Sequence, residues 1–158
     1  SHAKIAEAVN TLEFKDDQII GHNTDGIGLV IDLEQNLNIN LKSKKILLIG
    51  AGGAAEGVIY SMLEKKPSEL TLTNRTIERS NVIQNKMDVH AKSFDVNLNV
   101  TEIAKCPHQY FDLIINATSA SLSDDALHMD HKLGECASNV LEIKHFPGGG
   151  NKAYRIRE

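Results

Sequence analysis

The sequence contains few of the residues that mark several common protein classes. It has no tryptophan, 3 prolines and 2 cysteines among 158 residues, and only 4% of its residues are aromatic. The two cysteines, Cys106 and Cys136, lack C-x-x-C spacing and clustered histidines, so we interpret them as free thiols of a reducing compartment. The same spacing argues against a zinc site, and we expect no bound metal.

Long apolar runs and excess positive charge are also missing. No stretch approaches the roughly 18 apolar residues that cross a membrane, and the N-terminus lacks the pattern of a signal peptide. The formal net charge is −4, from 17 Lys and Arg against 21 Asp and Glu. A chain without a broad basic field does not gather nucleic acid or anionic lipid. We therefore expect a cytoplasmic protein without nucleic-acid or membrane partners, and its oligomeric state is left open.

Apolar strands alternate with amphipathic helices along most of the chain. Strands are expected at residues 45–49, 70–73, 111–116 and 139–143. The helix after the first of these has apolar residues at helical spacing, namely Ala55, Val58, Ile59, Met62 and Leu63. A second helix is expected over residues 77–86, with Val82 and Ile83 facing inward. This alternation predicts an α/β fold: a Rossmann-like, doubly wound, mostly parallel sheet with helices on both faces.

The N-terminal part of the sequence does not show this alternation of strands and helices. Residues 8–14 and 18–21 are typical of two strands, and the polar residues 15–17 between them predict a hairpin. Asn23 or Thr24 can cap a following helix that carries Ile27, Val30 and Ile31 on one face and ends in the polar stretch 35–40. At the other end of the chain, the glycines at 148–150 do not lie between a strand and a helix, so we expect a loose tail.

A glycine-rich turn follows the strand at 45–49 directly. Gly50 permits a tight exit from the strand, Gly52 lets backbone N–H groups approach a pyrophosphate, and Ala55 takes the small third position of G-x-G-x-x-G/A. The N-terminus of the next helix is a suitable place for a phosphate. The residues expected to bind a dinucleotide here are Gly50, Ala51, Gly52, Gly53 and Ala54.

The residues after the second strand indicate which dinucleotide the chain binds. NAD enzymes place an acidic residue roughly 20 positions after the first glycine to hold the ribose 2′-hydroxyl, whereas this chain has Asn74 followed by Arg75. Arg75 and Arg79, one helical turn apart, can grip a 2′-phosphate and cover the adenine, while Asn74 and Thr76 hydrogen-bond the same phosphate. Solvated surface charge is the ordinary alternative for both arginines. The pattern favours NADP.

A third polar segment follows the strand at 111–116. Parallel sheets bind ligands beyond the carboxyl ends of their strands, so this segment is expected to lie beside the other two. Asn116, Thr118 and Ser119 can contact the nicotinamide side of the cofactor. They can equally satisfy backbone groups of a tight turn.

Five segments together resemble the shikimate dehydrogenase family in order and spacing. They are residues 8–11 (Ala-Val-Asn-Thr), 23–28 (Asn-Thr-Asp-Gly-Ile-Gly), 50–54, 74–76 and 116–119. The Asn-Thr-Asp-Gly-x-Gly element distinguishes this family from other dinucleotide-binding domains. The resemblance implies NADP-dependent, reversible reduction of 3-dehydroshikimate to shikimate, a step toward the aromatic amino acids.

The resemblance also implies roles for two residues outside the cofactor turn. Asp25 would hold a substrate hydroxyl together with a lysine of the family's substrate domain and would tune that lysine for proton transfer. Asn10 would donate a hydrogen bond to a substrate hydroxyl. Taken on the residues alone, Asp25 is also an ordinary capping residue and Asn10 an ordinary turn residue.

In the family, the substrate domain precedes the cofactor domain and supplies this lysine and the serines that hold the substrate carboxylate. We find no counterpart of these residues, and residues 142–150 depart from the family's C-terminal pattern. We therefore interpret residues 1–22 as a remnant of the substrate-binding domain and residues 23–158 as an NADP-binding domain that alone binds only cofactor. Two alternatives stay open at this point: a stand-alone, non-catalytic NADP-binding or regulatory module, and another Rossmann dehydrogenase.

Overall fold

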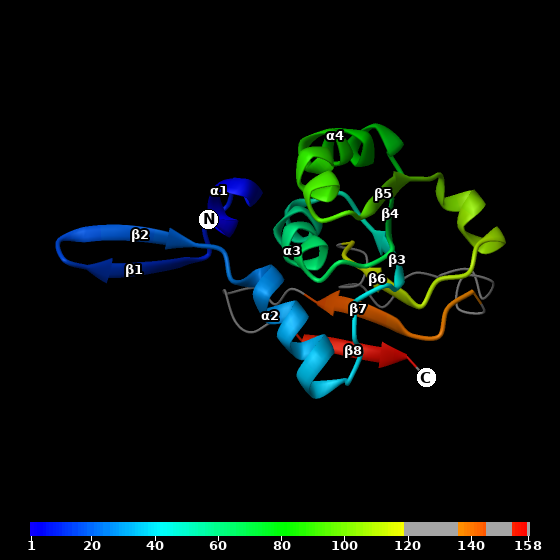
Figure 1. Ribbon diagram of the computed structural model, residues 1–158, viewed down its shortest axis with the longest axis horizontal. Coiled ribbons are helices and arrows are strands. Elements are labelled where there is room, and N and C mark those ends of the chain that lie inside the picture. The colour runs from blue at the N-terminus through cyan, green and yellow to red at the C-terminus, as the bar shows by residue number, and fades with distance from the viewer. Residues whose placement is uncertain (119–135, 145–152, 158) are drawn as a thin grey trace.

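The central feature of the molecule is a six-stranded sheet. A computed structural model describes residues 1–118, 136–144 and 153–157. Within these residues the strand order is β5-β4-β3-β6-β7-β8, and every neighbouring pair is parallel except β7 and β8 (Figure 1). The strands are β3 (Lys45–Ile49), β4 (Glu69–Thr73), β5 (Asn97–Val100), β6 (Leu113–Asn116), β7 (Val140–Lys144) and β8 (Ala153–Arg157).

Strand β3 lies at the point where the strand order reverses. It pairs with β4 on one side and with β6 on the other, so that Leu48 has Leu72 and Ile115 as its two neighbours. Its four apolar residues are buried, as a strand covered on both faces requires. The predicted doubly wound, mostly parallel sheet is confirmed, and the crevice beyond β3 and β6 is the place where such folds bind ligands.

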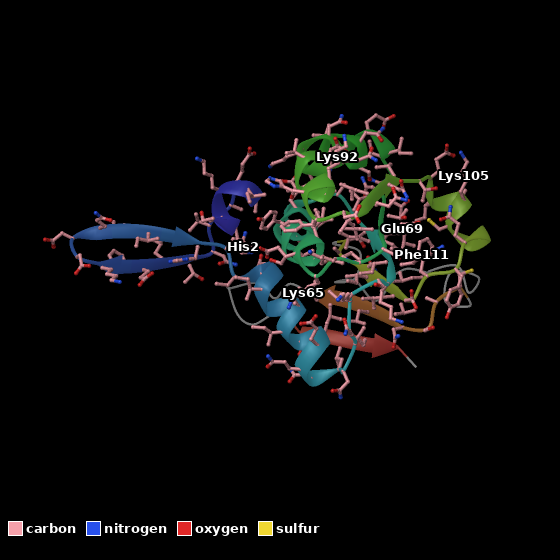
Figure 2. The ribbon with its side chains drawn as sticks, viewed as in Figure 1. His2, Lys65, Glu69, Lys92, Lys105 and Phe111 are labelled. Atoms are coloured by element: carbon pink, nitrogen blue, oxygen red, sulfur yellow. The ribbon has the colours of Figure 1, made fainter. Side chains whose placement is uncertain are left out.

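Helical segments cover both faces of the sheet. On one face, α2 (Asp25–Ile31), α3 (Gly53–Glu64) and α4 (Ile77–Ser93) enclose a core that includes Leu48 and Ile115. On the other face, Cys106 of the 3-10 helix η2 (Ile103–His108) packs with Phe111 against the sheet. Phe111 lies within this body, whereas Lys92 and Lys105 lie at its periphery (Figure 2).

The buried face of α2 differs from the predicted one. Ile27 and Ile31 are 41% and 45% exposed, and only Val30 of the predicted set is buried. Leu29, Val30 and Leu33 point inward because Gly26 lies against α3 and fixes the rotation of the helix. The helix continues through one π-helical turn, η1 (Asp32–Asn36), and so ends in the polar stretch where its end was expected.

Helix α4 is longer than predicted, and it turns Val82 outward. Val82 is 65% exposed, while Ile83 is buried as expected. The buried residues of α4 are Ser80, Ile83, Met87 and Ala91. Because the first of these is a serine, the pattern of apolar residues did not indicate which face of the helix is buried. Strands β5 and β8 were not predicted. The sequence of β5, Asn97 to Val100, alternates with asparagine at the sheet edge and gives a weak strand signal.

The predicted hairpin is confirmed as a separate two-stranded sheet. Strands β1 (Thr11–Lys15) and β2 (Gln18–His22) pair antiparallel, and Asp16 and Asp17 form the turn with positive φ values of 48° and 59°. The first strand begins at Thr11 rather than at residue 8. The hairpin extends away from the larger sheet (Figure 1). Before it, the unpredicted helix α1 (His2–Ala6) packs on α3, and the His2 ring lies edge-on to Tyr60 at 5.1 Å.

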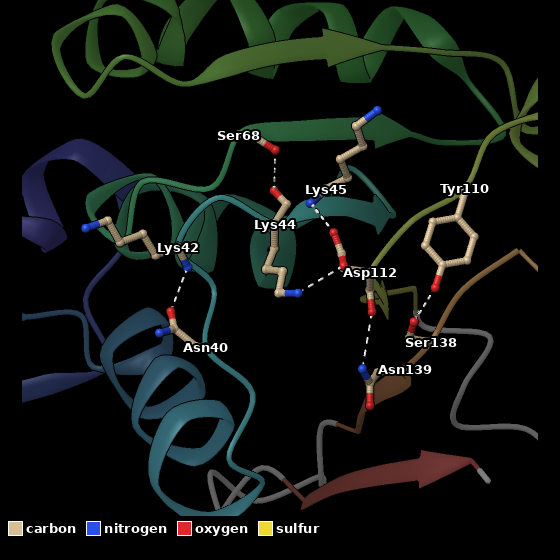
Figure 3. Close-up of polar contacts among 9 residues, drawn as sticks. All are labelled: Asn40, Lys42, Lys44, Lys45, Ser68, Tyr110, Asp112, Ser138 and Asn139. Atoms are coloured by element: carbon tan, nitrogen blue, oxygen red, sulfur yellow. Dashed lines mark hydrogen bonds and ion pairs between the residues drawn. The ribbon is translucent and has the colours of Figure 1, made fainter.

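Asp112 fixes the register of β3 against β6 at the edge opposite the predicted site (Figure 3). Its carboxylate accepts hydrogen bonds from the Lys45 N–H at 2.8 Å and from Lys44 Nζ at 3.1 Å. Its backbone oxygen accepts one from Asn139 Nδ2 at 3.3 Å. The Lys45 N–H bond, aided by Lys44, holds the pKa of Asp112 below its ordinary value.

This network predicts a loss of stability in acid. A carboxyl group whose pKa is lowered by folding stabilises the protein above its unfolded pKa of about 3.9, and this contribution disappears as the pH falls through the lower folded value. Asp112→Asn is expected to lower the free energy of unfolding near neutral pH by about 1–2 kcal/mol. The expected loss is small because the side chains of Asp112 and Lys44 are both partly exposed to solvent. Thermal melts from pH 7 to pH 2.5 would show the two proteins converging. Asp88→Asn, which removes an exposed pair with Lys92, is the control, and an equal loss there would contradict the prediction.

Candidate functional site

The carboxyl ends of β3, β4 and β6 are held together by backbone hydrogen bonds. The Gly50 N–H donates to the Thr73 carbonyl at 2.8 Å, and the Ala117 N–H donates to the Ile49 carbonyl at 2.8 Å. The loop after β3 is therefore tied to the end of both neighbouring strands. The structure brings together the glycine turn and two polar segments that lie far apart in the sequence.

Gly50 occupies a position that only glycine fits. Its φ is +117°, a conformation that other residues rarely adopt. A Cβ atom there would lie 3.1 Å from the carbonyl carbon and oxygen of Ala117 and 3.3 Å from Thr118 Cγ2. At this tight turn, the loop after β3 therefore lies close to the loop after β6.

Gly52 and Gly53 differ from Gly50 because they face open space. Among the described residues, a Cβ atom at either position would meet no atom within 4 Å beyond its chain neighbours, and the Gly52 backbone (φ −105°, ψ −176°) suits any residue. Gly52 is the N-cap of α3 and offers no side-chain cap, so the first N–H groups of the helix lack intrahelical acceptors. Ala54 packs partly on the core behind them, as does Ala51. We call this open, uncapped N-terminus of α3 at Gly52 and Gly53 the cradle, because exposed N–H groups at a helix N-terminus are a place where a phosphate can bind.

The segment after β4 presents two exposed arginines beside this cradle. Asn74 Nδ2 donates to the Thr76 carbonyl at 3.0 Å, and the Arg79 N–H donates to the same carbonyl at 3.2 Å, which shapes the turn into α4. Arg75 and Arg79 are exposed, and within the described part of the chain neither has an ion-pair partner. Both guanidinium groups are therefore available to an anionic ligand.

Asn116 and Thr118 form a closed turn after β6. Asn116 is fully buried, and its Oδ1 accepts hydrogen bonds from the Thr118 N–H at 3.1 Å and the Thr118 hydroxyl at 2.8 Å. Asn116 Nδ2 is buried without a partner among the described residues. The geometry favours the turn interpretation for Asn116, which holds Thr118 against Gly50. Ser119 lies outside the described residues, as do the glycines at 148–150.

Asn10 and Asp25 meet where the hairpin joins α2. Asn10 Nδ2 donates to Asp25 Oδ1 at 2.7 Å, and Asn10 Oδ1 accepts from the Thr24 N–H at 3.0 Å. The Asp25 N–H donates to Asn23 Oδ1 at 3.1 Å, so Asn23 supplies the cap and Thr24 makes no side-chain capping bond. The carboxylate of Asp25 is thereby directed toward Asn10, and the amide and carboxylate together can bind a hydroxyl group.

Sequence reasoning missed one residue beside this pair. A Cβ atom at Gly57 would lie 3.6 Å from both Cβ and Oδ2 of Asp25, so the aspartate side chain packs over a helix position that has no side chain. The available signal was a glycine inside an otherwise favourable helix, which commonly marks a close approach.

The remaining sequence expectations concern metals, thiols and membranes. In the parts that the structure describes, no three His, Cys, Asp or Glu side chains gather as metal ligands. Cys106 and Cys136 are free thiols, and burial raises the pKa of Cys106. No helix within residues 1–118, 136–144 and 153–157 is long and apolar enough to span a membrane.

Comparison with known proteins decides the family. Residues 32–129 match the profile of the Shikimate / quinate 5-dehydrogenase family. The chain belongs to this family. Membership removes the interpretation as an unrelated Rossmann dehydrogenase and confirms the resemblance seen in the sequence motifs.

The relatives found in the family are longer than this chain. A shikimate dehydrogenase (NADP(+)) of Hydrogenovibrio crunogenus is 43% identical over 139 residues, which cover 88% of this chain and 46% of that protein. One from Legionella pneumophila strain Corby is 46% identical over 123 residues, or 78% of this chain and 42% of that protein. The chain thus spans about half the length of the curated relatives it matches.

Solved structures of related enzymes share the fold. The crystal structure of an Ael1 enzyme from Pseudomonas putida superposes with a TM-score of 0.82 at 34% identity and covers 94% of this chain and 52% of its own. A shikimate dehydrogenase in complex with NADP+ gives a TM-score of 0.64 at 31% identity, covering 77% of this chain and 41% of that one.

Proposed function

We propose that this chain is the cofactor-binding part of an NADP-dependent shikimate dehydrogenase, which reversibly reduces 3-dehydroshikimate to shikimate. The open cradle at Gly52 and Gly53 carries the proposal, because glycines that neither the backbone nor the packing requires leave room for a ligand at a helix N-terminus. The fit of the residues to NADP supports it. The NADP named for the Hydrogenovibrio relative agrees with this fit.

Each polar group of the cradle has a proposed partner on NADP. The first N–H groups of α3, at Gly53 and Ala54, would hold the pyrophosphate, which Gly50 and Ala51 allow to approach. Arg75 and Arg79 would bind the 2′-phosphate together with Asn74 and Thr76, because charge-assisted hydrogen bonds favour a phosphate over a hydroxyl. Thr118 and Ser119 would line the nicotinamide side, with Asn116 holding the turn. When bound, the nicotinamide supplies the hydride.

Asp25 and Asn10 are the proposed contacts to the substrate. In the reduction, the developing alkoxide needs a proton donor, and a carboxylate beside that oxygen can hold and polarise the donor. The 2.7 Å hydrogen bond to Asn10 Nδ2 orients Asp25 Oδ1 before any ligand arrives. Asn10 would in turn donate to a neighbouring substrate hydroxyl. The observed pair supports an enzyme over a purely regulatory module, since Asn23 rather than Asp25 accepts the hydrogen bond at the start of α2 and the Asp25 carboxylate faces Asn10.

We also propose that residues 1–22 belong to a substrate-binding domain and that residues 23–158 form the NADP-binding domain. One face of the hairpin is apolar and uncovered, with Leu12, Phe14 and Ile19 exposed by 56%, 74% and 67%. The opposite face is mostly polar, with Ile20 as its apolar residue, and carries the Glu13–His22 ion pair at 3.0 Å. A two-stranded hairpin is marginal alone and gains stability when its apolar face is covered. The partner ligand is a small molecule, and the free thiols support a cytoplasmic location.

This assignment predicts that cofactor binding and turnover separate in this chain. Calorimetry on a polypeptide of these 158 residues is expected to show NADPH binding, while shikimate-dependent reduction of NADP is absent because none of these residues is assigned as the proposed lysine partner of Asp25. A separately expressed substrate domain of a relative is expected to restore a trace of activity, since association costs several kcal/mol that covalent linkage avoids.

A substitution on the hairpin provides the control for this experiment. Phe14→Glu is expected to remove the restored activity and leave NADPH affinity unchanged, because Phe14 is 74% exposed on the uncovered face. Failure of the unmodified chain to bind NADPH would overturn the cofactor assignment. Robust dehydrogenase activity from the chain alone would overturn the assignment of Asp25 and the division into domains.

A further inference from the structure

Helices α2 and α3 cross at residues that have little or no side chain. A Cβ atom at Gly26 would lie 2.5 Å from Ser61 Oγ, 2.9 Å from Ser61 Cβ and 2.7 Å from the Gly57 carbonyl oxygen. Distances under 3.0 Å require the neighbouring atoms to move, and a backbone carbonyl in a helix cannot move alone. Ser61 is 4% exposed, so the crossing is also closed to water.

The same crossing carries Asp25. This aspartate immediately precedes Gly26 and lies over Gly57, whose missing side chain leaves Asp25 Cβ and Oδ2 at 3.6 Å from the position a Cβ atom would take. Asn23 Nδ2 lies at the same distance from that position. Gly57 is in turn four residues along α3 from Gly53, where the cradle begins. One rigid helix therefore supports both the cradle and the aspartate.

We propose that Gly26 and Gly57 are positioning residues, which hold the Asp25 carboxylate against Asn10 and at a fixed place relative to the cofactor turn. This proposal rests on the proposed function, in which Asp25 contacts the substrate. Neither glycine acts on a ligand itself. Each acts by leaving out a side chain: Gly26 lets α2 approach α3, and Gly57 gives the Asp25 side chain its place on the surface of α3.

Helix propensity makes this arrangement informative. A glycine inside a helix is less favourable than alanine by about 1 kcal/mol, so its presence there needs a reason. Neither Gly26 nor Gly57 has the positive φ that would supply one. A Cβ atom at Gly26 would make contacts under 3.0 Å, whereas at Gly57 a Cβ atom would make ordinary contacts at 3.6 Å and only a longer side chain would meet Asp25. Gly28, in the same helix, has no such contact with the described residues, since a Cβ atom there would meet none of their atoms within 4 Å. Gly28 is thus a matched control for Gly26.

The test compares Gly26→Ala with Gly28→Ala by NMR of the ligand-free chain. The signal is the side-chain amide of Asn10, whose hydrogen bond to Asp25 gives it a distinct chemical shift, and Asp25→Ala provides the position of the broken pair. Gly26→Ala is expected to move the Asn10 signal to that position, whereas Gly28→Ala is expected to leave it in place and raise the melting temperature. NADP affinity is expected to stay within about twofold in both variants.

Gly57 provides a second variant that does not depend on the tight crossing. Gly57→Ala is expected to leave the Asn10 signal unmoved, because the contacts at 3.6 Å are ordinary, while Gly57→Leu is expected to displace Asp25 and move it. An unmoved Asn10 signal in Gly57→Leu, or in a folded Gly26→Ala, would overturn the positioning role. The readout needs no ligand, so a failure of the unmodified chain to bind NADP would overturn the proposed function separately.

Discussion

Gly52→Val is expected to abolish NADP(H) binding while the chain stays folded. The Gly52 backbone lies in a region open to any residue, and in the part of the chain that the structure describes no atom beyond the chain neighbours lies within 4 Å of an added Cβ, so we expect the fold to tolerate the substitution. The valine would instead fill the place where the pyrophosphate meets the backbone. Loss of two charge-assisted hydrogen bonds, at about 1.5–3 kcal/mol each, raises the dissociation constant roughly 10²- to 10⁴-fold.

Gly50→Val is the matched comparison, and the opposite result is expected. Its φ of +117° and the contacts at 3.1 Å with Ala117 penalise any side chain. Backbone strain and overpacking of about 1–3 kcal/mol each would destabilise the fold itself. Circular dichroism melts and NADP titrations of both variants separate the two effects. Normal NADP binding by Gly52→Val would show that the phosphate site lies elsewhere.

The second large effect is expected at the two exposed arginines. The unmodified chain is expected to bind NADP(H) more tightly than NAD(H), and Arg75→Ala with Arg79→Ala is expected to erase that preference. Each charged contact contributes about 1.5–3 kcal/mol, so each arginine accounts for roughly ten- to hundredfold in NADP affinity and almost nothing for NAD. Calorimetry with both dinucleotides measures the preference directly.

Lys92→Ala provides the control for these arginines. Lys92 is an exposed cation on the same helix, but it lies near the C-terminal end and pairs with Asp88. Its removal changes the net charge without touching the proposed phosphate site, so the preference for NADP is expected to persist. Equal affinity of the unmodified chain for NAD and NADP would contradict the role of both arginines. A loss of preference in Lys92→Ala would show that general charge, rather than a local contact, selects NADP.

The sequence was most informative where three local signals agree. At residues 45–64 an apolar run, a glycine turn and a helical spacing follow one another, and β3 and α3 were predicted closely. The rotation of α2 was wrong because a glycine, which gives no signal in an apolar pattern, decides which face packs inward. Ser80 misled the prediction of α4 in the same way. The edge strands β5 and β8 depend on pairing with a neighbouring strand, which composition does not reveal.

In the candidate site, too, some features follow from the sequence and others depend on packing. That the three polar segments meet follows from topology, because parallel strands end at one edge of the sheet. The family resemblance placed Asn10 and Asp25 separately at the substrate, but the hydrogen bond between them was not predicted, since they lie 15 positions apart on either side of a complete hairpin. The burial of Asn116 and the place of Asp25 over Gly57 depend on how loops and helices pack, which no motif encodes.

The junction between the hairpin and α2 has a mechanical consequence. Helices α1 and α2 both pack on α3, so any rotation of the hairpin relative to the large sheet must bend the chain at both ends of the hairpin, over residues 7–10 and between His22 and Asp25. Asn10 and Asp25 lie on either side of this pivot, joined by a bond of 2.7 Å, and the Asn10 N–H donates to the His22 carbonyl at 3.0 Å. Atoms near a rotation axis travel the least. The pair that we propose to bind substrate is therefore expected to keep its geometry when the hairpin rotates.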